Sequence, residues 1–305
     1  MTFETLLNSN GPILIDGGLA TQCEAMGCSI GGDLWSAELL QSNPRVLVDA
    51  HRAYLDAGAR IIISASYQAS RIGFMLHGLT EKQADALIVA SVDLAVQARD
   101  EYLHDNPSSD SPLIAASIGP YGAVMHDGTE YTGAYDVSRS ELEDFHGLRL
   151  ELLDQSDADL LACETIPSFE EAQILAELLR DARSPAWVSF SCRDELSIGD
   201  GTAVADAVSL FRDHPRVLAV GINCTAPQFT LSLINTIKTA VPDRSTVVYP
   251  NSGERYDAVS KTWSGNVTTD DWARSARQWA DAGANLIGGC CRTGPEQIRA
   301  IANVL

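Results

Sequence analysis

The chain has 305 residues, of which 45% are apolar and 20% are charged, a composition typical of a folded globular protein with a sizeable core. It carries 21 Lys and Arg against 41 Asp and Glu, which gives a formal net charge of -20. So acidic a surface repels phosphate backbones and anionic lipid. We therefore expect neither nucleic acid nor a membrane surface as a partner, and we expect cations to be favoured.

No signal for secretion or membrane insertion is found in the sequence. Met1 to Asn10 lacks a basic segment followed by an apolar one, and no stretch approaches the about 18 uninterrupted apolar residues of a membrane helix. The Cys count is 7, an odd number, and Cys290 and Cys291 are adjacent, which is unusual for a secreted disulfide framework. We therefore expect reduced thiols and a cytoplasmic location.

Short apolar, β-branched runs recur along the chain, and each precedes a segment with helical spacing. The runs are Ile13 to Gly18, Arg60 to Tyr67, Leu113 to Pro120, Leu160 to Thr165, Trp187 to Cys192, Val217 to Cys224, Thr246 to Ser252, and Asn285 to Cys291. Helix start signals lie between them, with Asn43-Pro44 before Arg45 to Ala57 and Pro167-Ser168 before Phe169 to Ala182. This alternation predicts a parallel sheet covered by helices.

A doubly wound sheet and a closed barrel both fit this alternation. Eight units without a composition break favour an α/β protein with a (β/α)₈ TIM barrel as a single domain over residues 1–305. A dinucleotide-binding sheet would open with G-x-G-x-x-G, whereas the first run leads into Asp16-Gly17-Gly18-Leu19-Ala20, and no Walker loop occurs. We expect longer loops at Asp33 to Ser42, Tyr121 to Tyr135 and Glu254 to Val267.

Thiols lie where the sixth and eighth apolar runs finish. Cys224 closes the sixth run and Cys290 with Cys291 closes the eighth, and in a barrel these ends meet at the face that carries the active site. Three thiolates are typical zinc ligands, and they leave a fourth position open in a catalytic site. No His lies in an H-x-H or H-E-x-x-H pattern. The alternative for any Cys is a packing role, which we assign to Cys23, Cys28, Cys163 and Cys192.

Two acids also end apolar runs, Asp16 the first and Glu164 the fourth. As a pair they could bind the ammonium group of an amino acid, with backbone N–H groups at Gly17 or near Ser66 taking its carboxylate. Two alternatives remain open. Each acid could cap the helix that follows it, and a carboxylate pair could hydrolyse glycosides, although that reaction has no use for the thiols.

Together these motifs resemble the homocysteine S-methyltransferase family through almost all of the chain. The stretches that carry the resemblance are Asp16 to Thr21, Leu34 to Ala37, Ser64 to Ser70, Gly119 to Ala123, Leu161 to Thr165, Gly221 to Cys224, Tyr249 to Glu254, Tyr256 to Trp263, and Gly288 to Thr293. The G-G-C-C motif together with N-C is highly specific. The Y-P-N-S-G-E and S-Y-Q-A-S stretches are most similar to the bacterial and plant enzymes that use S-methylmethionine, rather than to the betaine-dependent branch.

The resemblance implies a barrel that moves a methyl group from a sulfonium donor, S-methylmethionine or S-adenosylmethionine, to L-homocysteine and gives methionine. It implies Zn²⁺ as cofactor, held by Cys224, Cys290 and Cys291. The substrate contacts that we expect come from Asp16, Gly17, Ser66, Glu164 and Asn223, with the two acids on the homocysteine ammonium. The chain is too short for the modules of the cobalamin-dependent enzymes and lacks the C-terminal arm of the betaine enzymes, so we expect a monomer or homodimer.

The physical chemistry of these residues agrees with such a reaction. Only a thiolate is a good nucleophile, and coordination by zinc deprotonates a thiol at neutral pH. A cationic donor suits an acidic protein, and Tyr67, Tyr121 or Trp35 could offer it a cation–π face. Two other classes remain open. A zinc-storage or redox-sensing protein would need only the thiols, and a barrel lyase or hydrolase would use an acid such as Glu164 as general base.

Overall fold

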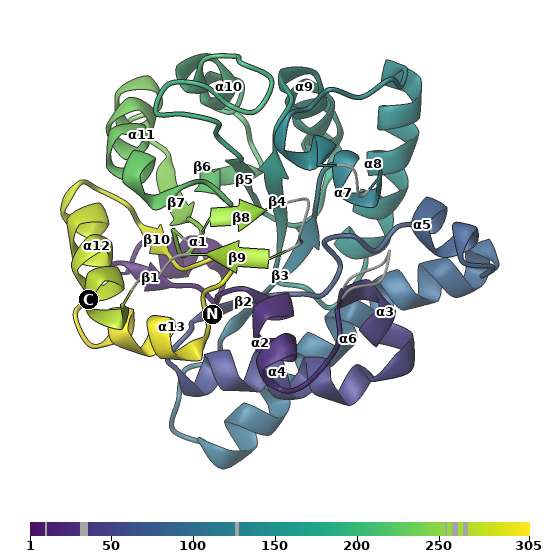
Figure 1. The fold of residues 1–305 in the computed structure, drawn as a ribbon, viewed down its shortest axis with the longest axis horizontal. Helices are drawn as coiled ribbons and strands as arrows, with labels where there is room; N and C mark the ends of the chain where they lie inside the picture. Colours follow the sequence, from purple (N-terminus) through teal and green to yellow (C-terminus); the bar gives the residue numbers. More distant parts are fainter. Residues whose placement is uncertain (10, 31–35, 126–127, 254, 258–261, 265–267) are drawn as a thin grey trace.

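The apolar runs form one parallel sheet that curves into a barrel (Figure 1). The computed structural model describes residues 1–305 except 10, 31–35, 126–127, 254, 258–261 and 265–267. The strands of the barrel sheet, in chain order, are β1 (Ile13–Leu14), β2 (Ile61–Ile63), β3 (Leu113–Ile118), β4 (Leu160–Ile166), β5 (Ala186–Phe190), β6 (Val217–Asn223), β7 (Ser245–Tyr249) and β10 (Leu286–Ile287).

Strand pairing shows that the sheet closes on itself. The order is β1-β10-β7-β6-β5-β4-β3-β2, and all neighbours are parallel. A further parallel bridge between Ile15 and Ile61 joins the ends of β1 and β2. The prediction of an α/β protein with a (β/α)₈ TIM barrel is therefore confirmed.

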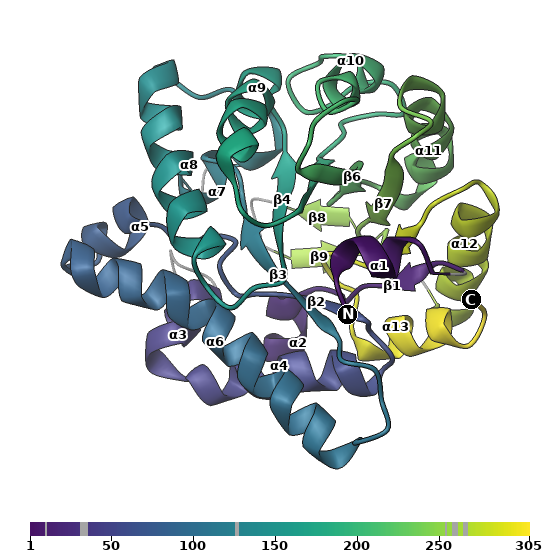
Figure 2. The ribbon, with the colours of Figure 1, turned by 180° about the vertical axis from the view of Figure 1, so that it is seen from behind.

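Helices surround the barrel, as Figures 1 and 2 show from its two ends. They are α1 (Phe3–Leu7), α2 (Leu19–Ala25), α3 (Ser36–Ser42), α4 (Pro44–Asp56), α5 (Arg71–Leu76), α6 (Glu81–Asp105), α7 (Gly122–Met125), α8 (Arg139–Asp154), α9 (Phe169–Leu178), α10 (Val204–Ser209), α11 (Pro227–Ala240), α12 (Thr269–Asp281) and α13 (Pro295–Ala302), with short 3₁₀ turns η1 (Thr129–Tyr131) and η2 (Leu179–Asp181). The predicted start signals are confirmed, because α4 begins at Pro44 and the Ser168 hydroxyl accepts from the Glu171 amide at the start of α9. Within the described part of the chain, none of the helices has both the length and the apolar surface to cross a bilayer.

The barrel interior is filled by side chains and is closed at one end. Phe3 and Leu6 of α1 belong to the same buried cluster as Trp187 and Tyr249, and the Phe3 and Trp187 ring centroids are 6.1 Å apart. Figure 2 shows α1 over this end of the barrel. The opposite end, where the strands finish, is therefore the open face, as in other barrels of this type.

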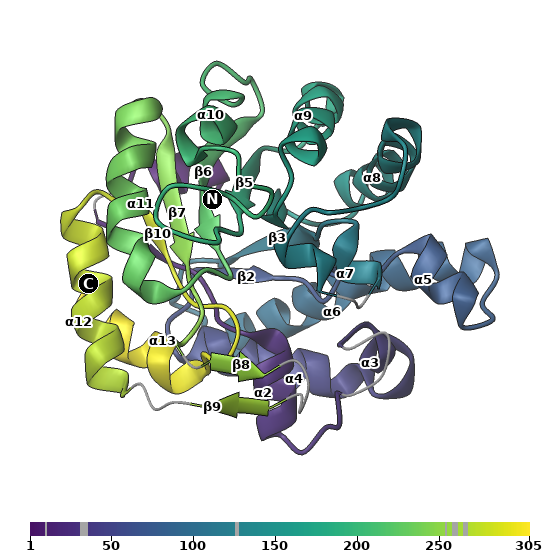
Figure 3. The ribbon, with the colours of Figure 1, turned by 45° about the horizontal axis from the view of Figure 1, so that its top comes forward.

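All three predicted loops contain regular structure in the residues that the structure describes. Residues 36–42 form α3, and the loop after β7 contains an antiparallel hairpin of β8 (Arg255–Asp257) and β9 (Thr262–Ser264), visible in Figure 3. The loop after β3 contains α7 and η1. All of these elements are too short to show a clear apolar period, which is why the sequence pattern predicted loops. Trp35, one candidate for a cation–π face, lies outside the described residues.

One glycine inside the barrel fixes how closely β6 and β7 approach. A Cβ added at Gly221 would lie 1.7 Å from the Val247 carbonyl oxygen. No side chain fits in that space, so a glycine is required three residues before Cys224.

We therefore expect Gly221→Ala to lower the free energy of unfolding by about 3 kcal/mol or more, since the new methyl overlaps the backbone of β7. Urea denaturation measures this. Gly147→Ala is the matched control, because its nearest neighbour is 3.9 Å away at Leu178 and a helix interior gains roughly 0.5–1 kcal/mol from the change. Equal stability of the two variants would contradict the close packing of β6 on β7.

Candidate metal centre and amino acid pocket

Three thiols from two distant segments meet at the open face. Cys224 follows β6, and Cys290 and Cys291 follow β10. Their Sγ atoms all lie within 4.8 Å of one another, and those of Cys224 and Cys291 are 3.7 Å apart. The predicted convergence of these residues is confirmed.

The end of β7 joins the two thiol-bearing turns by backbone hydrogen bonds. The amide of Cys224 donates to the Tyr249 carbonyl at 3.3 Å, and the amide of Cys290 donates to the Pro250 carbonyl at 2.9 Å. The Asn251 amide donates to the Thr225 carbonyl, and the Ser252 amide donates to the Cys291 carbonyl, both at 3.0 Å. One short segment therefore sets the position of both turns.

Backbone strain is concentrated at the same place. Within the described residues, the non-glycine residues with positive φ are Thr165 at 63°, Cys224 at 45° and Arg292 at 64°. All three follow or end strands at the open face, and the left-handed region is costly for residues with a Cβ. The geometry of the thiols is thus maintained against a local backbone preference.

The sulfur spacing fits a tetrahedral ion. Zinc–sulfur bonds of about 2.3 Å place two sulfur ligands about 3.8 Å apart, which agrees with the 3.7 Å between Cys224 and Cys291. Hydrogen bonds from the other two thiols lower the pKa of Cys291, whereas bonds to both neighbours, together with burial, raise the pKa of Cys224. The donor set, all sulfur, is the type that holds zinc or another thiophilic metal.

The remaining cysteines lie apart from this cluster, as predicted. Cys23 and Cys163 are buried, and Cys28 and Cys192 are half-buried. Burial raises the pKa of the Cys163 thiol to about 12, so it is inert as a nucleophile. Among the described residues, the thiol trio is the one group of three or more His, Cys, Asp or Glu side chains close enough to share an ion.

The two predicted carboxyl groups are buried beside the thiols. Asp16 Oδ2 accepts from the Ile63 amide at 2.7 Å, and Asp16 Oδ1 is buried without a hydrogen-bond partner. Glu164 accepts hydrogen bonds from the hydroxyls of Ser117 and Tyr249. Neither acid caps a helix, since Gly18 and Ser168 occupy the N-cap positions of α2 and α9.

Burial dominates the electrostatics of both acids. It raises the pKa of Glu164 to about 7, against hydrogen bonds from Ser117 and Tyr249 that lower it. Burial also raises the pKa of Asp16 well above its usual range, and the charge of Glu164 adds to the effect. Neither carboxyl has an ion-pair partner in the described part of the chain. The pocket is therefore short of positive charge, which a bound ammonium group would supply.

The other predicted substrate contacts divide into two kinds. Among the described residues, the backbone amides of Gly17 and Ser66 have no hydrogen-bond acceptor, so both remain available to a ligand. Asn223, by contrast, is fully buried, accepts from the Thr165 amide at 2.6 Å and donates to the Thr165 hydroxyl at 2.7 Å. These bonds support the end of β4, and the expected contact of Asn223 with substrate stays a prediction.

The Ser66 hydroxyl has a supporting role too. It bonds the Ser64 hydroxyl and donates to the Ser117 carbonyl, both at 2.7 Å, and the side chain is fully buried. A contact between Ser66 and a substrate would therefore use its amide, as the strand-end argument expected, rather than its hydroxyl.

Sequence reasoning missed several residues that build the site. Tyr249 bonds Glu164 and Ser189, and Tyr54 donates to the carbonyls of Gly18 and Thr293, which ties the first loop to the last. Arg149 is buried in α8, where amphipathic spacing offered no sign of it. Its three carbonyl acceptors come together only in the fold, so this buried charge could not be found from the sequence pattern.

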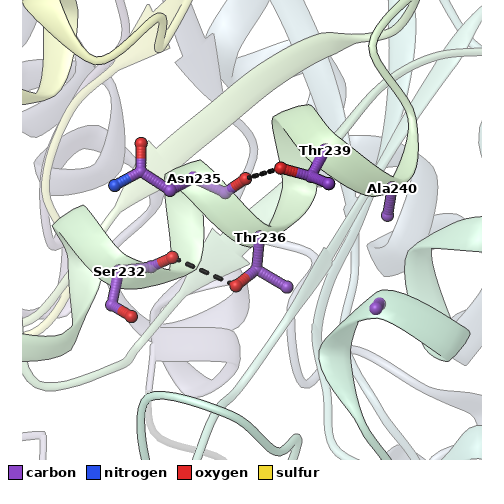
Figure 4. Close-up of a pocket in the computed structure, with 6 residues that line it drawn as sticks. Ser232, Asn235, Thr236, Thr239 and Ala240 are labelled. Carbon is purple, nitrogen blue, oxygen red and sulfur yellow. Dashed lines mark hydrogen bonds between the residues drawn. The ribbon is translucent and has the colours of Figure 1, made fainter.

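A separate surface hollow of about 380 Å³ lies between α10 and α11 (Figure 4). Its lining is Ala205, Ser232, Asn235, Thr236, Thr239 and Ala240. The Thr236 and Thr239 hydroxyls already donate to carbonyls of their own helix at 3.2 and 2.8 Å. With no charged side chain in its lining, this hollow offers no chemistry comparable to the thiol cluster.

The fold and the site define a (β/α)₈ barrel whose open face combines a cluster of three thiols with two buried acids. A family model described as homocysteine S-methyltransferase matches residues 13–305. The chain belongs to the homocysteine S-methyltransferase family, and the resemblance seen in its motifs is confirmed.

Individual relatives cover nearly the full length. The chain is 47% identical over 300 residues to a homocysteine S-methyltransferase of Escherichia coli, covering 97% of this chain and 96% of that protein. It is 46% identical over 301 residues to the homocysteine S-methyltransferase YbgG of Bacillus subtilis, covering 97% and 95%. The metallated form of the homocysteine methyltransferase MmuM from Escherichia coli superposes with a TM-score of 0.88 at 43% identity, covering 98% of each chain.

The raised pKa of Glu164 predicts a stability cost at high pH. Its pKa is 4.5 in an unfolded chain and about 7 in the fold, so the native state binds the extra proton and loses stability as the pH rises between these values. Glu164→Gln should therefore gain about 2–3 kcal/mol relative to the parent between about pH 5 and about pH 8. Urea denaturation at several pH values measures the gain. Glu170→Gln, an exposed neighbour, serves as control, and a pH-independent difference for Glu164→Gln would contradict the assignment.

Proposed function

We propose that this chain is a zinc-dependent homocysteine S-methyltransferase that takes its methyl group from S-methylmethionine in preference to S-adenosylmethionine. Family membership and the names of the relatives support the activity, and the metallated form of MmuM supports a metal. The observation that carries the proposal is the placement of three thiols beside two buried acids that have no cation of their own within the described residues.

In this proposal, Cys224, Cys290 and Cys291 hold the ion through their thiolates. Zinc bound there supplies a fourth position that takes up the homocysteine sulfur and lowers the pKa of its thiol. The end of β7 holds all three residues in place, through the amides of Cys224 and Cys290 and the carbonyl of Cys291.

Asp16 and Glu164 recognise the amino acid part of homocysteine in this proposal. Their carboxylates accept hydrogen bonds from its ammonium group, and the free Oδ1 of Asp16 is the acceptor that the fold leaves unused. The amides of Gly17 and Ser66 are available to its carboxylate. A bound ammonium lowers the pKa of both acids, so neither needs to exchange a proton with the reacting atoms.

The donor preference rests on the S-Y-Q-A-S and Y-P-N-S-G-E motifs and on the lack of a glycine-rich nucleotide fingerprint after the first strand. Direct displacement leaves the main catalytic task to proximity and orientation, which the rigid barrel mouth supplies. A pocket fitted to a small donor gains nothing from the adenosyl group.

The decisive experiment is a methyl-transfer assay with homocysteine and each of three donors in competition. We expect kcat/KM to be highest for S-methylmethionine, lower for S-adenosylmethionine and negligible for betaine. A preference for S-adenosylmethionine would overturn the ranking alone, whereas a preference for betaine would overturn the donor class. No transfer from any donor would favour the zinc-storage or general-base classes instead.

Changing Cys290→Ala should abolish both metal binding and methyl transfer while the barrel stays folded, because the thiol lies at the mouth rather than in the packed interior. Zinc content after dialysis, with circular dichroism as the test of folding, measures this. Cys28→Ala is the matched control and should keep its zinc. Full zinc occupancy in Cys290→Ala would refute the ligand assignment.

Asp16→Asn should weaken homocysteine binding by about 10- to 150-fold, the equivalent of one charge-assisted hydrogen bond of about 1.5–3 kcal/mol. Zinc content should stay unchanged, since Asp16 is not in the thiol cluster. Calorimetric titration with homocysteine measures the effect, and a simple alkyl thiol without the amino acid group should bind parent and variant equally. Unchanged homocysteine affinity would rule out this role for Asp16.

A further inference from the structure

Two tyrosine side chains reach the thiol cluster from the surrounding loops. Tyr131 of η1 donates a hydrogen bond from its phenol to Cys291, and 39% of the residue remains exposed. Tyr67 follows β2 and is half-buried, and its phenol bonds the Thr165 side chain near Cys224. Both phenols therefore lie beside the thiol cluster.

Tyr67 is held in place by Gly119 and Arg149. A Cβ added at Gly119 would lie 2.7 Å from Cδ2 and Cε2 of this ring, so one edge of the ring packs against the backbone of the loop after β3. The buried guanidinium of Arg149 donates to the carbonyls of Tyr67, Ser66 and Gly119 at 2.9, 3.1 and 2.8 Å. Arg149 thereby joins the loops after β2 and β3 and fixes the backbone of Tyr67.

The Tyr131 segment packs between α7 and the loop after β5. A Cβ added at Gly122 would lie 2.4 Å from the Glu130 amide nitrogen, and one at Gly199 would lie 2.7 Å from the Tyr131 carbonyl oxygen. Below it, the Tyr135 phenol donates to Glu171 at 3.1 Å, and Glu171 also accepts from buried His146 at 2.7 Å. The segment is therefore built into the face of the barrel.

The Glu130 carboxylate lies near the rings of Tyr67, Tyr131 and Tyr135. Burial is the main cause of the raised pKa values of Tyr67, Tyr131 and Tyr135, and the negative charge of Glu130 adds to all three. Glu130 is the neighbour of Tyr131 in η1, so it lies beside the same aromatic residues in the connection after β3. The site has two acidic regions, one at the strand ends and one in the loops.

We infer that Tyr67, Tyr131 and Glu130 form the binding site for the cationic sulfonium centre of the methyl donor. The inference rests on the proposed function and assigns the loop region to the donor, as the strand-end acids serve homocysteine. Aromatic faces attract a sulfonium through their quadrupoles, and the carboxylate offsets its charge.

The reaction itself removes the charge that this site recognises. The bond between the methyl carbon and the donor sulfur breaks with its electron pair left on the donor, and a new bond joins that carbon to the homocysteine thiolate sulfur. A sulfonium and a thiolate become two neutral thioethers, with no further oxidant or proton needed. The spent donor therefore loses its attraction to Tyr67, Tyr131 and Glu130 and leaves.

Binding of S-methylmethionine and of methionine, measured by calorimetry without homocysteine, tests the site. The two ligands differ by one methyl group and one positive charge. The Kd of methionine divided by the Kd of S-methylmethionine therefore reports recognition of the sulfonium alone. We expect Glu130→Gln and Tyr131→Ala each to reduce this ratio about tenfold, and Tyr131→Phe, which keeps the ring, to reduce it much less. Glu195→Gln, an exposed acid in the loop after β5, is the matched control and should leave the ratio unchanged.

Kinetics of the zinc-loaded enzyme supply a second readout. The donor KM should rise in Glu130→Gln and Tyr131→Ala, while the homocysteine KM and zinc content stay as in the parent. Loss of zinc or of homocysteine affinity with an unchanged Kd ratio would overturn the inference, as would a parent that binds the sulfonium no more tightly than methionine. A parent that prefers the sulfonium but transfers no methyl group would refute the proposed function and leave the donor site standing.

Discussion

The site depends on four backbone hydrogen bonds made by residues 249–252. They connect the turn after β6 with the turn after β10, segments whose thiols are 67 positions apart in the chain. The thiols themselves cannot provide this constraint, because three thiolates in one place repel one another. The peptide groups of the β7 end therefore do the positioning, and the sulfur atoms are left free for chemistry. The close contact of Gly221 with Val247 serves the same end by bringing β6 against β7.

The burial of Asp16 and Glu164 without a cation nearby in the described residues lowers the stability of the fold. Asp16 and Glu164 are buried beside each other without a positive partner in the described chain, and their raised pKa values express that cost. A cation that bound between these acids, as proposed for the homocysteine ammonium group, would recover the stability that their burial costs. Sites that bind charged ligands in a dry environment commonly show this exchange between stability and function.

The strand ends were predictable from the sequence, and the supporting contacts were not. A polar residue or thiol after an apolar run is visible in one dimension, so the sequence predicts Asp16, Glu164 and the three Cys at the open face. The hydrogen-bond partners of the Asn223 side-chain amide come from other strands of the sheet. The sequence of one strand does not indicate its register with another, so these partners could not be predicted. Tyr131 lies in an irregular loop without periodicity, and Arg149 looks like an ordinary helix-surface residue until three carbonyls are found around it. Short elements such as α3 and the β8–β9 hairpin escape prediction for a related reason, since they have too few residues to show a period.

The position of β10 links the thiol cluster to the order of synthesis. This strand is the last of the barrel in sequence, yet it lies between β1 and β7, so the wall of the barrel stays incomplete until residues 286–287 have emerged and inserted. Cys224 is synthesised more than sixty residues before Cys290 and Cys291, so it stays without these two thiols while the nascent chain folds. A truncated or partly folded chain offers a single thiol at this place, and one thiol binds a metal weakly. The three thiols can therefore come together only on a finished barrel, so a metal that needs all three sulfur ligands would bind only after the barrel is complete.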